Sequence, residues 1–206
     1  MISITITFVA IITAIVVLIH ALLPQEGADH NKIREALLDF YDKTNGVHWF
    51  NSTGWEIEGG DPEGSDSQSE ADYCNWHGIY CEANTIIGIN LLSNNVTAGD
   101  FTLSSLHPIK SLLSVKLVNN EIHGDIAEIL DSVREENPNL LKLDIAVNEG
   151  VTGEIPPHYC QRTAGTQRLV LEVNGNITCD CCNDENAFWT DQSSCDDLFL
   201  PRRYVF

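Results

Sequence analysis

The chain has 206 residues, and its 30 acidic and 11 basic residues give a formal net charge of −19 at neutral pH. Surfaces that bind nucleic acid need a basic footprint, so this balance excludes nucleic acid as an expected partner and disfavours adhesion to an anionic membrane surface. A hydrophobic content of 43% is enough for one packed domain, which excludes general disorder.

The chain begins with a long apolar segment. Residues 2–23 carry no charged side chain, and the small residue Ala21 stands where a signal peptidase could cut. We predict that residues 1–21 are a cleaved signal peptide; the alternative is a signal anchor, because about 20 apolar residues can span a bilayer. Both alternatives predict a secreted or cell-surface protein, with the membrane as a partner only if residues 2–23 stay uncleaved.

The segment that follows has helical periodicity. Residues 32–43 (KIREALLDFYDK) predict an amphipathic helix. Its apolar face holds Ile33, Ala36, Leu37 and Phe40. Residues 44–46 (TNG) end the pattern, and we expect Gly46 to adopt the left-handed conformation that ends many helices.

Three tryptophans then offer flat apolar surface beside two cysteines, Cys74 and Cys81: Trp49, Trp55 and Trp76. We expect this surface to close one end of the core and the two cysteines to staple it, so that residues 30–83 form an N-terminal cap. Residues 56–73 within it are rich in acids and poor in apolar residues. They predict an acidic surface insertion that aids solubility, which we favour over a weak calcium site.

A repeated pattern occupies the middle of the chain. Segments that start at residues 86, 112 and 140 read L-x-x-L-x-L-x-x-N-x-L, with Ile or Val at some Leu positions and with spacings of 26 and 28 residues. This pattern and period are typical of leucine-rich repeats. A degraded fourth copy at residues 169–171 lacks the Asn, so residues 84–173 hold three clear repeats and one degraded repeat.

The pattern predicts a fold. Its aliphatic residues alternate along short strands and point inward, and its ninth-position Asn can satisfy buried backbone groups where the chain turns. These asparagines are Asn94, Asn120 and Asn148. One repeat cannot cover its own apolar face, so neighbouring repeats must stack. The predicted fold class is α/β: a short leucine-rich-repeat solenoid with an N-terminal helical cap and a cysteine-rich C-terminal cap in residues 174–206.

Five more cysteines lie near the end of the chain: Cys160, Cys179, Cys181, Cys182 and Cys195. We predict disulfides within the cluster Cys179, Cys181, Cys182 and Cys195, because clustered cysteines staple small units in oxidising compartments. That environment makes zinc ligation by these thiolates the weaker alternative. The total of seven cysteines leaves one thiol unpaired, or available for a covalent dimer.

Several segments together resemble a known family. Residues 36–46 (ALLDFYDKTNG), 51–55 (NSTGW) and 74–81 (CNWHGIYC) resemble the N-terminal cap of plant-type leucine-rich-repeat proteins, versions of which occur in secreted algal proteins. Residues 151–156 (VTGEIP) match the plant-type repeat ending. The resemblance covers about residues 33–195 and implies a protein that binds proteins, peptides or wall polysaccharides.

The C-terminal cysteines extend the resemblance. Residues 179–182 (CDCC) are similar to the C-terminal cap of diatom-like members of this family, which usually carry a further cysteine where this chain has Val173. This departure implies that Cys160 is the unpaired thiol.

In this fold the strand residues between the inward aliphatics line a concave surface. The candidate ligand-binding residues on it are Asn90, Leu92, Lys116, Val118, Lys142 and Arg168. Because three of the eleven basic residues fall on one face of an acidic protein, we hypothesise that they contact an anionic ligand. The alternative is that Asp144 and Glu172 neutralise them locally.

The remaining motifs concern glycosylation and catalysis. Sequons at Asn51, Asn95 and Asn176 predict N-glycosylation in a secreted chain. No nucleophile elbow, H-E-x-x-H motif, P-loop or kinase signature occurs. We therefore predict no catalytic residue, no cofactor and no metal site.

Two functions from different classes remain. The first is an extracellular or cell-surface recognition module that binds a protein or cell-wall polysaccharide through its concave strand face. The second is a glycosylated, acidic structural protein of the cell surface or wall without a discrete ligand. Neither is an enzyme.

Overall fold

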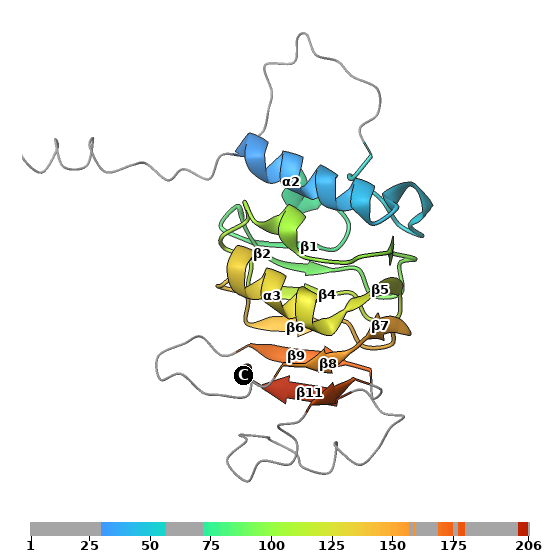
Figure 1. Ribbon diagram of the computed structural model, residues 1–206. Helices are drawn as coiled ribbons and strands as arrows, with labels where there is room; N and C mark the ends of the chain where they lie inside the picture. Colours follow the sequence, from blue (N-terminus) through green and yellow to red (C-terminus); the bar gives the residue numbers. More distant parts are fainter. Residues whose placement is uncertain are drawn as a thin grey trace, which may run out of the picture.

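A six-stranded sheet runs through the computed structural model, in the order β1-β2-β4-β6-β9-β11 (Figure 1). Its four inner strands are parallel, and β1 and β11 pair antiparallel at the two edges. Their bounds are β1 Ile79–Glu82, β2 Thr85–Asn90, β4 Ser114–Lys116, β6 Lys142–Asp144, β9 Val170–Val173 and β11 Arg202–Val205. The predicted repeats therefore each contribute one parallel strand.

The structure describes residues 30–56, 72–156, 159, 169–174 and 177–179, and the backbone of 202–205. Outside it lie the predicted signal segment 1–21, most of the acidic insertion and most of the C-terminal cap. Arg168, Asn176, Cys160, Cys181, Cys182 and Cys195 also lie outside the described residues, as does the side chain of Cys179. Within the described residues no helix is long and apolar enough to cross a membrane.

Shorter strands stack beside the main sheet. A second parallel sheet, β3-β5-β7, pairs the segments that follow β2, β4 and β6, and β8 pairs with β10. Their bounds are β3 Thr97–Ala98, β5 Glu121–Asp125, β7 Gly150–Thr152, β8 Glu154–Ile155 and β10 Thr178–Cys179. The result is a mixed α/β molecule with two stacks of parallel strands.

Helices and helical turns connect and cover these strands. They are α2 His30–Lys43, η1 Gly46–His48, η2 Asp72–Asn75, η3 Ser104–Leu106 and α3 Ile126–Glu136. The helix α2 lies across one end of the strand stack, beside β1 and β2 (Figure 1). The helix α3 follows β5 directly and packs against β5, β8 and η3.

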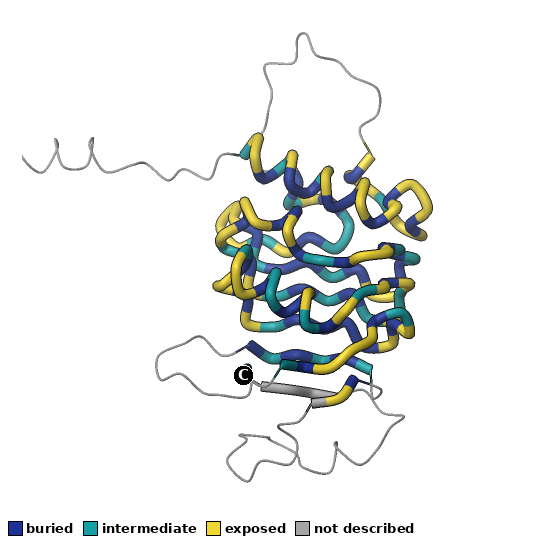
Figure 2. The backbone as a smooth tube through the Cα atoms, in the orientation of Figure 1, coloured by how far each residue is buried: buried dark blue, intermediate teal, exposed yellow. Residues whose placement is uncertain are grey.

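The core lies between the strands and these connections, and buried residues alternate with more exposed ones along the strands (Figure 2). As predicted, the aliphatic residues of the three clear repeats point inward, and each of these side chains is at most 1% exposed: Ile89, Leu91, Val115, Leu117, Leu143 and Ile145. Each buried aliphatic side chain contributes on the order of 1.5–3 kcal/mol to stability. The alternation leaves the other side of the sheet to face outward.

A line of asparagines ties neighbouring repeats together. The Asn120 side chain accepts hydrogen bonds from the Asn94 and Val96 amides at 2.9 and 3.0 Å. The fully buried Asn148 accepts from the Ile122 amide at 3.1 Å and donates to the Leu117 carbonyl at 2.9 Å. These bonds confirm the predicted role of the Asn in satisfying buried backbone groups.

The expectation that the fourth repeat lacks this asparagine is wrong. Asn174 accepts from the Asn148 amide at 3.2 Å and donates to the Asn148 carbonyl. It follows the aligned residue Leu171 by three positions, whereas Asn148 follows Leu143 by five. The residue five positions after Leu171 is Asn176, which lies outside the described residues.

The predicted amphipathic helix is confirmed as α2. Its buried residues are Ile33, Ala36, Leu37, Phe40 and Tyr41. Trp55 is completely buried, with the rings of Trp49 and Trp76 at centroid distances of 5.0 and 5.2 Å. Cys74 and Cys81 form the expected disulfide beside this cluster.

The left-handed residue after α2 is Asn45, with φ of 58°, and not Gly46 as the sequence suggested. Gly46 is needed for space instead, because an added Cβ would lie 2.1 Å from Cδ2 of the Tyr41 ring. The two turn residues therefore have separate roles.

Candidate functional site

The candidate site is the outer face of the sheet, defined as the side opposite the buried aliphatic residues. Strand register aligns its side chains in rows. The central row holds Asn90 on β2, Lys116 on β4, Asp144 on β6 and Glu172 on β9. Adjacent strands lie about 4.8 Å apart, so neighbours in this row are within reach of one ligand.

A second row lies one step toward the start of the strands. It holds Tyr80 on β1, Gly88, Ser114, Lys142 and Val170. Tyr80 is 56% exposed, and its Cβ lies 3.7 Å from where a Cβ on Gly88 would stand. An exposed aromatic ring therefore begins the row.

The basic side chains of the face are only partly free. The Lys142 ammonium pairs with Glu172 at 2.9 Å and approaches Asp144 Oδ2 at 3.7 Å. Lys116 makes no ion pair with any residue that the structure describes. This geometry favours local neutralisation of Lys142 over an unpaired basic strip, and the third member, Arg168, lies outside the described residues.

Asp144 differs from its expected position in solvent. It points outward, because Leu143 and Ile145 on either side point inward, yet it is only 7% exposed. Burial raises the pKa of its carboxyl, and the neighbouring Glu172 adds to the rise, while Lys142 opposes it. The buried Oδ1 atom has no well-placed donor among the described residues, although the Ala146 backbone amide and the Glu172 side chain both interact with this carboxyl group.

The C-terminal ends of the strands form an apolar end of the face. Leu92 is 58% exposed, and Val118 is half-buried at the next strand. The following residues, Ser93, Asn119 and Val147, all have positive φ, between 52° and 58°. Such a backbone is common for Asn but strained for a β-branched residue such as Val147.

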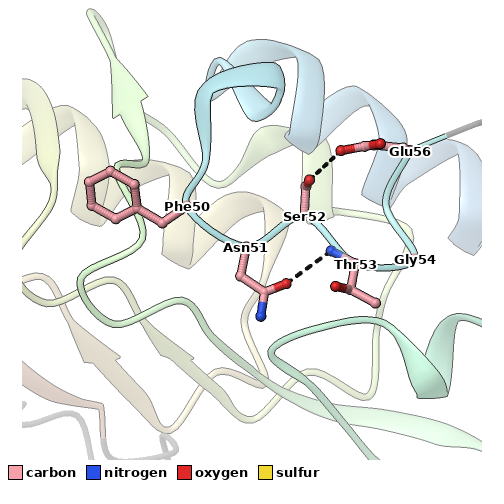
Figure 3. A pocket seen from close by; sticks show the side chains of 6 residues that line it. All are labelled: Phe50, Asn51, Ser52, Thr53, Gly54 and Glu56. Atoms are coloured by element: carbon pink, nitrogen blue, oxygen red, sulfur yellow. Dashed lines mark hydrogen bonds between the residues drawn. The ribbon is translucent and has the colours of Figure 1, made fainter.

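Two predicted glycosylation sites lie at the N-terminal end of the described chain. The Asn95 amide donates to the His48 carbonyl at 2.8 Å. Asn51 is exposed and lines a surface hollow of about 560 Å³ (Figure 3). Polar groups in this hollow pair with one another: the Asn51 side chain accepts from the Thr53 amide at 3.1 Å, and Ser52 donates to Glu56. The hollow thus presents satisfied groups to solvent.

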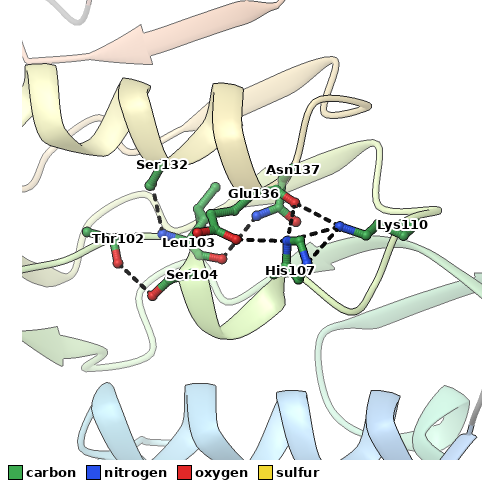
Figure 4. Close-up of polar contacts among 8 residues, drawn as sticks. All are labelled: Thr102, Leu103, Ser104, His107, Lys110, Ser132, Glu136 and Asn137. Carbon is green, nitrogen blue, oxygen red and sulfur yellow. Dashed lines mark hydrogen bonds and ion pairs between the residues drawn. The ribbon is translucent and has the colours of Figure 1, made fainter.

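A second polar cluster joins η3 to the end of α3 (Figure 4). His107 Nδ1 lies 2.8 Å from the Glu136 carboxylate, and the Lys110 ammonium lies 3.0 Å from the same nitrogen. Asn137 donates to the Leu103 carbonyl at 3.0 Å. These contacts satisfy the Glu136 and Leu103 carbonyls near the helix C-terminus, whereas Asn137 Oδ1 is buried without a hydrogen-bond partner among the described residues.

Neither cluster resembles a catalytic or metal site. In the described ranges no group of three or more His, Cys, Asp or Glu side chains could hold a metal ion.

Sequence reasoning placed Asn90, Lys116 and Lys142 on one face, as the structure does, but missed Tyr80 and the buried state of Asp144. The alternation within β1, where Ile79 is buried and Tyr80 exposed, was a usable signal for the tyrosine. No comparable signal exists for Asp144, because its burial comes from neighbouring strands.

No protein-family model and no curated protein sequence matches the chain. Among solved structures, the chain is similar to plant leucine-rich-repeat receptor ectodomains. A chain of the PEPR1–AtPEP1 crystal structure is 25% identical with a TM-score of 0.43, covering 69% of this chain and 17% of that chain. The BIR2 ectodomain from Arabidopsis thaliana is 25% identical with a TM-score of 0.45, covering 65% of this chain and 62% of that one.

A chain of the BIR3–SERK2 complex from Arabidopsis thaliana is 20% identical with a TM-score of 0.37, covering 56% of this chain and 57% of that chain. In all three comparisons the chain spans less than two thirds of the matched chain's length.

Proposed function

We propose that this protein is an extracellular leucine-rich-repeat recognition module that binds one partner through the outer face of its sheet. The observation that carries the proposal is the register of that face. Consecutive repeats present Asn90, Lys116, Asp144 and Glu172 in one row, with the exposed Leu92 at the end of β2. The side chains that do not pack in the core thus lie together on one surface.

The composition of this surface supports recognition. Polar and charged side chains in the middle provide directional hydrogen bonds, and apolar side chains at both ends provide area that a partner can bury. Leu92 and Tyr80 are each more than half exposed, so they take little part in the packed core and can contact a partner.

The proposal includes the finer sequence-based assignments. The solenoid has residues 30–83 as its N-terminal cap and residues 174–206 as its C-terminal cap, the outer face is its concave side, and the chain is not an enzyme. The Cys74–Cys81 disulfide supports an oxidising compartment, as expected of a chain exported by residues 1–21. The partner is a protein or a wall polysaccharide.

The test is capture by the full chain, purified from a secretory host and immobilised. Wall polysaccharides and secreted proteins of the source organism are applied to the wild type, to Leu92→Asp and to Lys116→Glu. Val47→Asp is the matched control, because Val47 is 74% exposed in the turn after α2, off the outer face. Capture of the same partner by wild type and control, with loss in both face variants, supports the module. Equal capture by all four proteins, or by none, favours the structural wall protein.

A further inference from the structure

We propose that the outer face of the sheet, from Tyr80 on β1 to Asp144 on β6, is a binding site for an uncharged oligosaccharide. The inference rests on the proposed recognition function and names the ligand chemistry of the same face.

The buried acceptor on Asp144 is the first observation. The side chain points outward between two inward residues, is only 7% exposed, and its Oδ1 atom has no hydrogen-bond donor among the described residues. Buried acceptors in folded proteins are nearly always paired, so an open one points to a missing donor. The Lys142 ammonium, on a side chain that is 29% exposed, lies 3.7 Å from the other carboxyl oxygen, Oδ2. Side chains around Asp144 must move before a ligand hydroxyl can bond Oδ1, because that atom is buried.

Donors and acceptors alternate along the central row. Lys116 is the register neighbour of Asp144, and Asn90 is the register neighbour of Lys116. The row therefore offers an amide that donates and accepts, an ammonium that only donates and a carboxylate that only accepts. A hydroxyl group both donates and accepts, so adjacent hydroxyls on one sugar ring can bridge neighbouring members of this row.

Charge argues against an ionic ligand. The ammonium groups of Lys116 and Lys142 balance the carboxylates of Asp144 and Glu172 on the face, so any charged ligand meets a group of like sign within a few ångströms. An anion is further opposed by the net charge of −19. Charge-assisted hydrogen bonds to a neutral ligand avoid both costs.

Tyr80 supplies the apolar part of the site. Its ring is 56% exposed at the edge strand, and its register neighbour is the side-chain-free Gly88. An aromatic ring with one polar tip suits the apolar C–H face of a sugar, whose edge carries hydroxyls. Three strand spacings separate β1 from β6, about 14 Å. That span suits several linked sugars better than one.

The experiment titrates the full chain with defined probes by isothermal calorimetry. The uncharged probes are cellohexaose, laminarihexaose and mannohexaose, and the charged probe is hexagalacturonate. We expect at least one uncharged probe to bind and hexagalacturonate not to bind. Asp144→Ala and Tyr80→Ala should each weaken binding roughly tenfold or more, as loss of a charge-assisted hydrogen bond or of a buried aromatic contact predicts.

Two further variants separate binding from folding. Tyr80→Phe keeps the ring and should bind within about twofold of wild type, because stacking needs only the ring. Gly88→Val adds bulk beside Tyr80 and should abolish binding while the protein stays folded, since its Cβ meets no atom nearer than 3.6 Å. Circular dichroism checks that each variant is folded.

The inference is overturned if no uncharged hexasaccharide binds at millimolar concentration, if hexagalacturonate binds more tightly, or if Tyr80→Ala and Asp144→Ala bind like the wild type. A captured protein that Leu92→Asp loses, with no sugar bound, would keep the recognition function and remove only this ligand class.

Discussion

At the scale of single residues, Asp144 links the site to stability. Burial raises the pKa of its carboxyl above the ordinary value of 3.8, so the folded chain holds this proton more tightly than the unfolded chain does. Its contribution to the free energy of unfolding is therefore greatest below that ordinary value and falls as pH rises through the raised pKa. We expect wild type to gain stability relative to Asp144→Asn as pH is lowered from 7 to about 4.

Urea unfolding of both proteins across this range measures the difference. Asp39→Asn is the control with the opposite sign, because the hydrogen bond from Lys43 lowers the pKa of Asp39. There the wild type should lose stability relative to the variant only as pH falls below the ordinary value of 3.8, so this pair is followed to lower pH. Parallel stability curves for wild type and Asp144→Asn would contradict the raised pKa.

Val147 is a second residue whose local conformation should affect stability. Its φ of 58° is a conformation that its counterparts Ser93 and Asn119 adopt more easily. Val147→Gly should raise the free energy of unfolding by about 1 kcal/mol, because the strained backbone conformation is relieved. Val118→Gly, in a backbone without positive φ, should lower it. Thermal and urea unfolding measure the stability of both variants, and a Val147→Gly variant less stable than the wild type would rule out strain at this position.

At the scale of elements, the asparagine line holds the repeats in register. The Asn148 side chain donates to the carbonyls of Leu117 and Ile145 and accepts from the Ile122 amide, all out of contact with water. Asn148→Ala leaves these groups unpaired and should cost about 3 kcal/mol or more. Asn174→Ala, at the partly exposed end of the line, should cost less. Equal losses in urea unfolding would show that position in the line does not matter.

In the turn after α2, Asn45 adopts the left-handed conformation and Gly46 leaves space for the Tyr41 ring, and substitutions test these two roles separately. Gly46→Ala forces a methyl group against the Tyr41 ring and should cost about 1–3 kcal/mol. Asn45→Gly should change stability by less than about 1 kcal/mol, because glycine adopts the left-handed conformation freely. If thermal unfolding shows a harmless Gly46→Ala, the close packing against Tyr41 is refuted.

Elements differ in how far the sequence reveals them. The strands and their inward residues were predictable because a two-residue alternation recurs at nearly constant spacing. The helix α3 was missed, although Asp125 caps it through the Ala127 amide and Ile126, Ile129, Leu130 and Val133 recur at helical spacing. A search for repeated units overlooks an element that only one repeat contains. The site was half predictable, since register follows from the pattern while the burial of Asp144 depends on neighbouring side chains.

At the scale of the whole molecule, one hydrophobic cluster runs from α2 through all four parallel strands to Ile177. A defect in the middle should therefore weaken the entire described fold in one transition, as expected for stacked repeats that share an interface. Leu117 is completely buried on the strand side of this cluster. Leu117→Ala should cost about 3–5 kcal/mol, a large fraction of the 5–15 kcal/mol that typically stabilises a domain.

The Cys74–Cys81 disulfide lies at the N-terminal end of this cluster and should also raise the temperature of the single melting transition. It closes a loop of short sequence separation, 7 residues, so replacing both cysteines by serine should cost about 2–3 kcal/mol. Leu113→Ala is the matched control for Leu117→Ala, because Leu113 directly precedes β4, which Leu117 directly follows, and is 37% exposed. We expect one melting transition in every variant, lowest for Leu117→Ala and near wild type for Leu113→Ala. Wild-type melting of Leu117→Ala or of the serine variant, or a separate early transition confined to one end, would show that the core and the staple do not stabilise the molecule as a single unit.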